Sequence, residues 1–203
     1  MSTPEPFPKI RQEVQAVVTA VENRTGLRSR WNGQLNVVDQ ATADFLSHQR
    51  FNAKKEWSCG ITVVEGITED DRRWRTLIHE ALHSVSVGLT ESDYSRYRGW
   101  EEGIVEWLQR CYRPDVLRSL HVRISEAFFV ELEKDWLYEP YIDALERIAG
   151  QIAEVPAQMF FEKLLQTPLK ERAAFVLSWG LKEAVDAAKF KRVFAEASGK
   201  LRG

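Results

Sequence analysis

The chain has 203 residues, of which 44% are hydrophobic and 29% charged, and its formal net charge is −2. These values are ordinary for a folded domain and give no electrostatic case for binding nucleic acid or an anionic membrane. Cys59 and Cys111 lie far apart, and no run of residues resembles a signal peptide or a membrane span, so we expect a cytoplasmic protein with reduced thiols.

The start of the chain predicts a leader followed by a helix. Residues 1–8 are rich in proline, and we predict a flexible leader there. From Pro8 onward apolar residues recur at helical spacing, and Gly26 is a plausible stop. The apolar positions of this predicted helix are Ile10, Val14, Val17, Val18 and Val21.

Two short runs rich in β-branched residues come next, at 35–38 and 61–64. Glycine or asparagine precedes each run, which is typical of short strands, so we predict a small sheet. Residues 39–52, between the two runs, fit either a helix or a loop.

Everything after Gly66 has the pattern of helices. The first predicted helix follows the acidic residues 69–71 and ends near Gly88, and the second runs over 99–112, before Pro114. Further amphipathic segments lie at 124–136, 141–152, 160–165, 170–177 and 182–197. A sheet at the front and helices at the rear predict an α+β fold, with a core over 9–112 and a helical subdomain over 113–203.

The sequence His79-Glu80-Ala81-Leu82-His83 lies in the first of these helices. With about 3.6 residues per turn, His79 and His83 share one helix face, so both imidazoles can bind one metal ion. Zn²⁺ accepts neutral histidine nitrogens, and Glu80 stands beside them as a general base for a zinc-activated water. This His-Glu-x-x-His signature of zinc peptidases predicts one Zn²⁺ per chain.

A catalytic zinc site needs a third protein ligand. The pattern with a third histidine six residues further on is absent, because Leu89 stands where that histidine would be. The following helix offers glutamates instead, and Glu102 comes after 18 residues that separate it from His83. Glu101 is the alternative ligand, but only Glu102 has an acid, Glu106, four residues later on the same helix face.

This order of residues resembles the gluzincin zinc metallopeptidases, and its spacing is similar to that of the M1 aminopeptidases. In size the chain is closer to the small minigluzincins. The resemblance covers residues 61–106 and implies a zincin-like fold. It also implies three zinc ligands: His79, His83 and Glu102. Glu80 would then be the base, and Glu106 would orient His79.

Gluzincins also supply a donor for the oxyanion, which in the M1 group is a tyrosine in a Tyr-Glu-x-Gly setting. Tyr138-Glu139-Pro140-Tyr141 shares the first two of these residues. The resemblance therefore makes Tyr138 the first candidate donor and Tyr141 the second. Ordinary packing of both rings is the alternative.

In gluzincins an edge strand before the zinc helix pairs with extended substrate through its main chain. The corresponding residues here would be Gly60, Ile61, Thr62, Val63 and Val64. A plain core strand is the alternative for this segment.

The leading functional hypothesis is a zinc-dependent endopeptidase acting on a peptide or protein substrate. The Gly-x-Met-Glu-Asn motif that holds the substrate amino terminus in M1 aminopeptidases is not found before His79. The alternatives are a non-catalytic zinc-binding interaction module and a zinc hydrolase of a non-peptide amide or ester. His48, His121 and the basic stretch 189–202 are expected to be ordinary surface or core features. Oligomeric state is left open.

Overall fold

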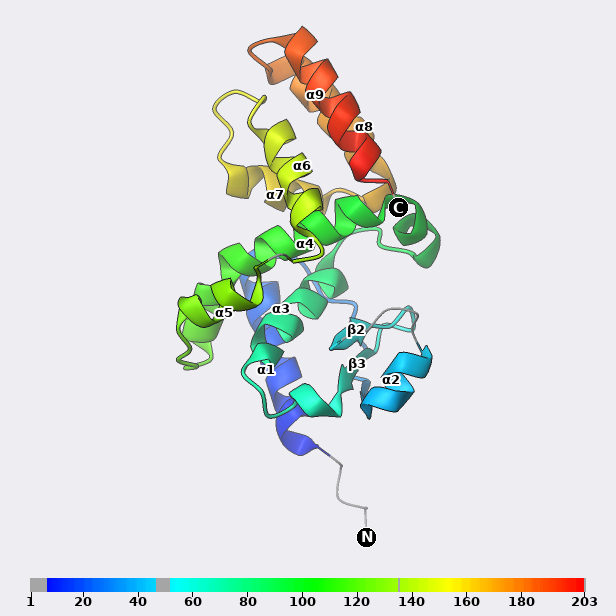
Figure 1. Cartoon of the computed structure of the whole chain (residues 1–203), viewed down its shortest axis with the longest axis vertical. Coiled ribbons are helices and arrows are strands. Elements are labelled where there is room, and N and C mark those ends of the chain that lie inside the picture. The colour runs from blue at the N-terminus through cyan, green and yellow to red at the C-terminus, as the bar shows by residue number, and fades with distance from the viewer. Residues whose placement is uncertain (1–6, 47–51, 135, 203) are drawn as a thin grey trace. The chain divides into compact units, whose positions relative to one another are not determined.

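The computed structural model describes residues 7–46, 52–134 and 136–202, which form α-helices and a small β-sheet (Figure 1). The prediction of a mixed fold with a helical rear is confirmed at this coarse level. The chain divides into two compact units: Met1–Val85 with Tyr112–Phe129, and Ser86–Cys111 with Val130–Gly203. The predicted domains were divided after residue 112 instead, because the sequence does not show that residues 86–111 pack with the C-terminal helices.

The first helix, α1, spans Pro8–Thr25, as its apolar spacing predicts. Pro8 stands at the start of the helix, where an N–H group would have no acceptor within the helix, so its missing N–H costs nothing. Gly26 ends the helix with a φ of 70°, a left-handed conformation that favours glycine. Residues 1–6 of the predicted leader lie outside the described residues. The buried side chains of α1 are the five predicted ones: Ile10, Val14, Val17, Val18 and Val21.

The sheet of the first unit contains β1 (Leu35–Val38), β2 (Ala53–Lys55) and β3 (Ile61–Val64). Its order is β1-β3-β2, with β1 parallel and β2 antiparallel to β3. The predicted strands β1 and β3 are confirmed, and α2 (Gln40–Leu46) occupies part of the segment between them. Residues 47–51 lie outside the described part of the chain.

The position of β3 corrects one prediction. The segment Gly60–Val64 was expected to be an edge strand, but β3 is the central strand and all four of its residues are buried. The main chain of β3 pairs with β1 on one side and β2 on the other, so it presents no edge to a peptide. The plain core strand, which was the alternative, describes this segment.

After the short 3₁₀ turn η1 (Glu65–Ile67), α3 spans Arg72–Val85 and packs against α1 and β2. The carboxylate of Asp70 accepts a 2.7 Å hydrogen bond from the main-chain N–H of Arg72 and so caps the first turn. Arg73 then forms a two-pronged ion pair with Glu13 of α1, at 2.8 and 3.0 Å. The start of α3 and its faces toward α1 and β2 are therefore held within the first unit.

The next helix, α4, spans Glu91–Ser119 and is longer than the predicted 99–112. The helical geometry of α4 is interrupted at Tyr97, which has a non-helical φ of −130°. Beyond this break the helix continues through Pro114. Val116 and Leu117 are buried beyond the proline, which gives the last turns a packing gain that offsets its cost of about 3 kcal/mol. The prediction that Pro114 limits the helix was wrong for this reason.

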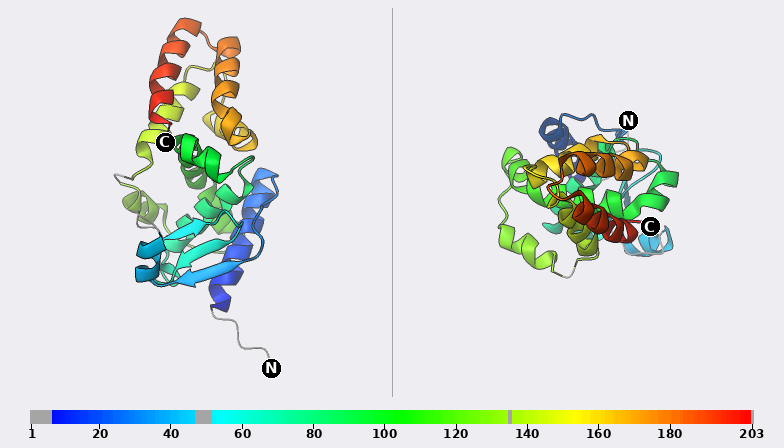
Figure 2. Two further views of the ribbon diagram at one scale, coloured as in Figure 1. Left: turned by 90° about the vertical axis from the view of Figure 1, so that its right-hand side faces the viewer. Right: turned by 90° about the horizontal axis from the view of Figure 1, so that it is seen from above.

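The remaining helices are α5 (Glu126–Leu132), α6 (Glu139–Ala149), α7 (Ala157–Gln166), α8 (Arg172–Glu183) and α9 (Ala187–Lys200), with the 3₁₀ turn η2 (Leu169–Glu171) before α8. In the second unit α6 packs on α7 and α9, and α8 lies antiparallel beside α9 (Figure 2). The predicted start of the last helix at residue 182 was wrong, because Asp186 caps α9 with two 2.9 Å hydrogen bonds from main-chain N–H groups.

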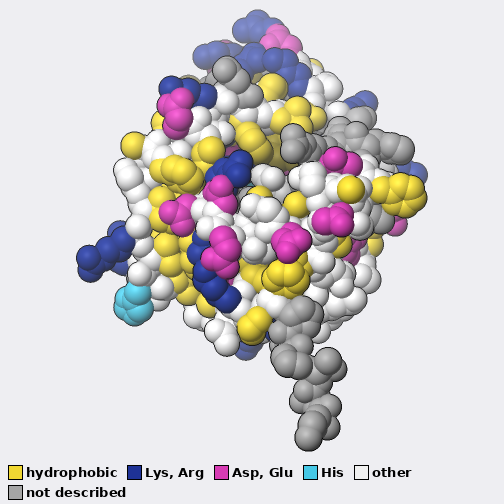
Figure 3. Space-filling view, turned by 60° about the horizontal axis from the view of Figure 1, so that its bottom comes forward, with side chains coloured by type: hydrophobic (Ala, Val, Ile, Leu, Met, Phe, Trp, Pro, Cys, Tyr) yellow, Lys and Arg dark blue, Asp and Glu magenta, His cyan; other side chains and the backbone are white. Residues whose placement is uncertain are grey.

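The surface of the described residues carries mixed charge. On the face drawn in Figure 3, acidic and basic side chains are interspersed with hydrophobic ones, in keeping with the formal net charge of −2. None of the described helices combines the length and apolar character needed to cross a membrane.

The contact between α8 and α9 depends on Gly180, because a Cβ atom added there would overlap the ring of the buried Phe190. We expect Gly180→Ala to lower the free energy of unfolding by about 1–3 kcal/mol through overpacking. Gly199→Ala, in α9, is the matched control: its Cβ would meet nothing within 4 Å, and it should stabilise by about 0.5–1 kcal/mol. Urea unfolding of both variants checks this, and equal effects would contradict it.

Candidate metal site

Helix α3 places His79 and His83 on one face, one turn apart. Their Nε2 atoms are 3.1 Å apart, and the ring planes meet at 78° with centroids separated by 4.7 Å. Each residue is 7% exposed. Two nitrogens bound to one tetrahedral zinc at about 2.0–2.1 Å are about 3.3 Å apart, so this separation suits two ligands of one ion.

Glu80 is buried and its carboxylate is held by the sheet. The main-chain N–H of Lys55, in β2, donates a 2.6 Å hydrogen bond to Oε2 of Glu80. A charge-assisted bond of this length restricts the carboxylate to one orientation. The candidate base is thus positioned by main chain, independently of the side chain at position 55.

Glu102 lies on α4 and is 3% exposed. The hydroxyl of Tyr94 donates a short hydrogen bond to its Oε1 atom. Burial raises the pKa of Tyr94, and the charge of Glu102 raises it further, so the phenol stays protonated and remains a donor. Tyr94 was missed in the sequence because it precedes the break at Tyr97, across which helical spacing predicts no contact.

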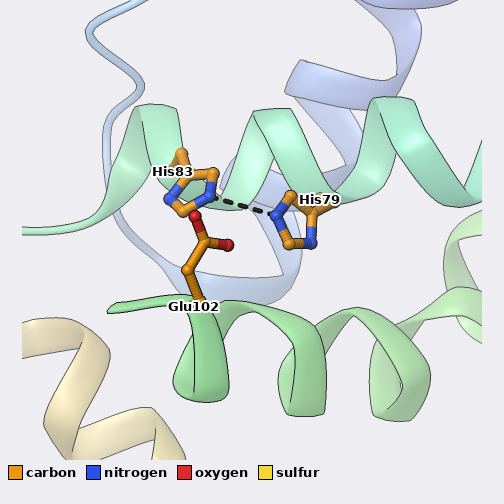
Figure 4. Close-up of side chains that lie close together, drawn as sticks. All are labelled: His79, His83 and Glu102. Carbon is orange, nitrogen blue, oxygen red and sulfur yellow. Dashed lines mark hydrogen bonds between the residues drawn. The ribbon is translucent and has the colours of Figure 1, made fainter. Parts of the chain in front are cut away.

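Ligand atoms of His79, His83 and Glu102 all lie within 4.8 Å of one another, so these residues could hold a metal ion (Figure 4). Two imidazole nitrogens and one carboxylate oxygen are a donor set suited to zinc, and three protein ligands leave a fourth position open. This is the set the sequence predicts. The chemistry of these donors therefore suits Zn²⁺.

Glu101, the alternative ligand, has other partners. Its Oε2 atom accepts hydrogen bonds from Arg172 at 2.6 Å and from Ser86 at 2.9 Å. Among the described residues, the group that could hold a metal ion consists of His79, His83 and Glu102 and does not include Glu101. These contacts favour Glu102 among the two glutamates.

Glu106 is fully buried and pairs with Arg110, whose Nε donates a 3.2 Å hydrogen bond to its Oε1 atom. Arg110 also bonds Glu139 at 2.8 Å and lies 3.6 Å from Glu133. The sequence did not predict this network of three carboxylates around one guanidinium. That Glu106 orients His79 stays a prediction.

The two candidate oxyanion donors lie near each other in the second unit. The rings of Tyr138 and Tyr141 are stacked with centroids 6.3 Å apart, and both residues are half-buried. Arg98 hydrogen-bonds Tyr138, and Tyr138 lies within electrostatic reach of Tyr94. Tyr138 therefore lies in the surroundings of Tyr94 and Arg98. That Tyr138, or Tyr141 in second place, donates to the oxyanion stays a prediction.

Of the two remaining histidines, only His121 lies in the part of the chain that the structure describes. His121 is exposed and has a φ of 56°, and the metal-ligand group of the described residues does not include it. His48 lies outside the described residues.

Replacing Tyr94 by phenylalanine should weaken zinc binding. The change removes the hydroxyl that orients Glu102, and loss of an outer hydrogen bond to a zinc ligand costs about 10-fold or more in metal affinity. Competition with a chromophoric chelator measures the dissociation constant. Tyr97→Phe is the matched control, since it removes the same hydroxyl from a neighbouring half-buried tyrosine. Equal zinc affinities for both variants would count against a role for Tyr94.

Comparison with known proteins gives no relative: no family model, no curated protein and no solved structure matches this chain.

Proposed function

We propose that the protein is a zinc-dependent metallopeptidase that cleaves peptide bonds within a peptide or protein substrate. The observation that carries the proposal is the grouping of His79, His83 and Glu102. Glu80 adds to it, because it lies between the two histidines on α3 with its carboxylate held by Lys55. A purely structural zinc site has no need of that carboxylate.

In this proposal His79, His83 and Glu102 hold the zinc ion. When bound, zinc supplies a Lewis acid that activates water and polarises a carbonyl group. Glu80 accepts a proton from the attacking water and later delivers it to the leaving amine. Tyr138, or Tyr141 in second place, donates a hydrogen bond to the oxygen on which charge develops.

Endopeptidase activity is proposed rather than aminopeptidase activity. The chain lacks, before His79, the Gly-x-Met-Glu-Asn motif that binds a substrate amino terminus. A substrate that runs through the site without a terminus to anchor needs no such motif.

The test combines metal analysis with a peptide library. We expect about one zinc per chain and cleavage within library peptides that stops on chelation and returns with added zinc. Zinc without cleavage of any peptide would favour the non-catalytic interaction module. Zinc with hydrolysis only of non-peptide amides or esters would favour the third alternative, and a chain that binds no zinc would contradict all three.

A further inference from the structure

A completely buried ion pair lies next to Glu102 in the second unit. Arg172, the first residue of α8, donates a 2.6 Å hydrogen bond from Nη1 to Glu101 and a 2.7 Å bond from Nη2 to the Ser86 hydroxyl. That hydroxyl donates in turn to Glu101 at 2.9 Å. Arg172, Glu101 and Ser86 are each 0% exposed.

The third nitrogen of the Arg172 guanidinium also donates a hydrogen bond. This Nε atom donates a 3.1 Å hydrogen bond to the main-chain oxygen of Thr167, just before η2. The guanidinium therefore contacts three parts of the second unit: residue 86, α4 and the turn that leads into α8. Its planar fork is suited to holding several acceptors in one fixed geometry.

A buried ion pair of this kind is weak evidence for stability. Desolvation of both charges offsets most of their attraction, and replacing such a pair by apolar residues of similar volume is often neutral or stabilising. What the ion pair contributes is a fixed geometry, because its hydrogen bonds form in only one arrangement of the helices and turns that carry the two residues. Here one of those elements is the zinc-ligand segment of α4.

Successive residues of an α-helix point about 100° apart. Because Glu101 is fixed by Arg172, the rotation of α4 about its axis is fixed too, and so is the direction in which Glu102 points. Two close approaches add to this. A Cβ atom at Gly99 would lie 2.8 Å from the Cα atom of Leu201, and one at Gly103 would lie 2.8 Å from a methyl carbon of Leu145.

We propose that Arg172 is a positioning residue for the metal site: through Glu101 it sets the direction of Glu102. This rests on the proposed zinc site. It gives the C-terminal helices a part in that site, because Arg172 lies 71 positions beyond Glu101 in the chain. This role of Arg172 concerns zinc binding and is independent of the substrate.

The test separates geometry from stability with two variants of the full chain. Arg172→Met leaves the Glu101 charge buried and unpaired, so the apo protein should unfold at a lower urea concentration. Arg172→Met with Glu101→Met removes both charges and should restore most of that loss. Its zinc dissociation constant should nevertheless stay about 10- to 100-fold above that of the wild type, as for other groups that orient a ligand. Its cobalt-substituted form should show an altered visible spectrum.

Arg147→Met is the control, because it breaks an exposed ion pair with Glu196 in the same unit and should change neither zinc affinity nor the spectrum. Should the double variant fail to fold, Arg172→Lys keeps the charge without the fork and should also weaken zinc binding. A folded double variant, or failing it a folded Arg172→Lys, with wild-type zinc affinity and cobalt spectrum overturns the inference alone. A wild type that binds no zinc overturns both this inference and the proposed function.

Discussion

The Glu80→Gln variant is expected to keep its zinc and to lose hydrolysis by about 10²–10⁴-fold, which is the usual contribution of a general base. Glutamine cannot accept the proton of the attacking water. Its amide oxygen can still accept the hydrogen bond that the Lys55 main-chain N–H gives to Glu80, so the side chain should stay in place. His79 and His83 are unchanged, and zinc content should therefore equal that of the wild type.

The measurements for Glu80→Gln are zinc content and kcat on a peptide that the wild type cleaves. Glu65→Gln is a suitable control, because it makes the same change of charge at an exposed position just after β3 and should leave both quantities unchanged. If Glu80→Gln cleaved peptide at the wild-type rate, Glu80 would not be the base. If it lost zinc as well as activity, its role would be to hold the site together.

The parts of the fold that the sequence predicts are those encoded by local patterns. Helix α1 was predicted in full because five apolar residues at helical spacing lie between Pro8 and Gly26. Strand β2 was missed because Ala53–Lys55 is short and contains two lysines, so only its pairing with β3 defines it. That same pairing makes β3 central, so the edge strand that the resemblance implied there was wrong.

The candidate site likewise has contacts that local sequence patterns predict and contacts that they do not. The spacing of His79 and His83 on one turn predicts their proximity, because a helix brings residues four apart together. The contact between Arg172 and Glu101 joins residues 71 positions apart, and no periodicity of the sequence connects them. Tyr94 reaches Glu102 across the break at Tyr97, and that break could not be read from the residues alone.

Replacing His83 by alanine is expected to abolish zinc binding, since two protein ligands do not make a zinc site of the usual kind. Added zinc at a hundred times its dissociation constant should stabilise the wild type by about 2.7 kcal/mol, and His83→Ala should show none of this gain. Thermal unfolding with and without zinc measures the difference, and metal analysis gives the occupancy. His121→Ala is the matched control, because His121 is an exposed histidine outside the metal-ligand group.

The same measurement distinguishes the two glutamates of α4. Glu102→Gln should lose the zinc-dependent stabilisation, because it replaces a charged ligand by a weak neutral one. Glu101→Gln should keep a folded site, because the amide oxygen of glutamine can still accept the hydrogen bond from Arg172. It should bind zinc more weakly than the wild type, because one charge of the buried pair is lost. If Glu102→Gln bound zinc as tightly as the wild type while Glu101→Gln bound none, the ligand would be Glu101. The positioning role of Arg172 would then fall with that assignment, since Arg172 would contact the ligand itself.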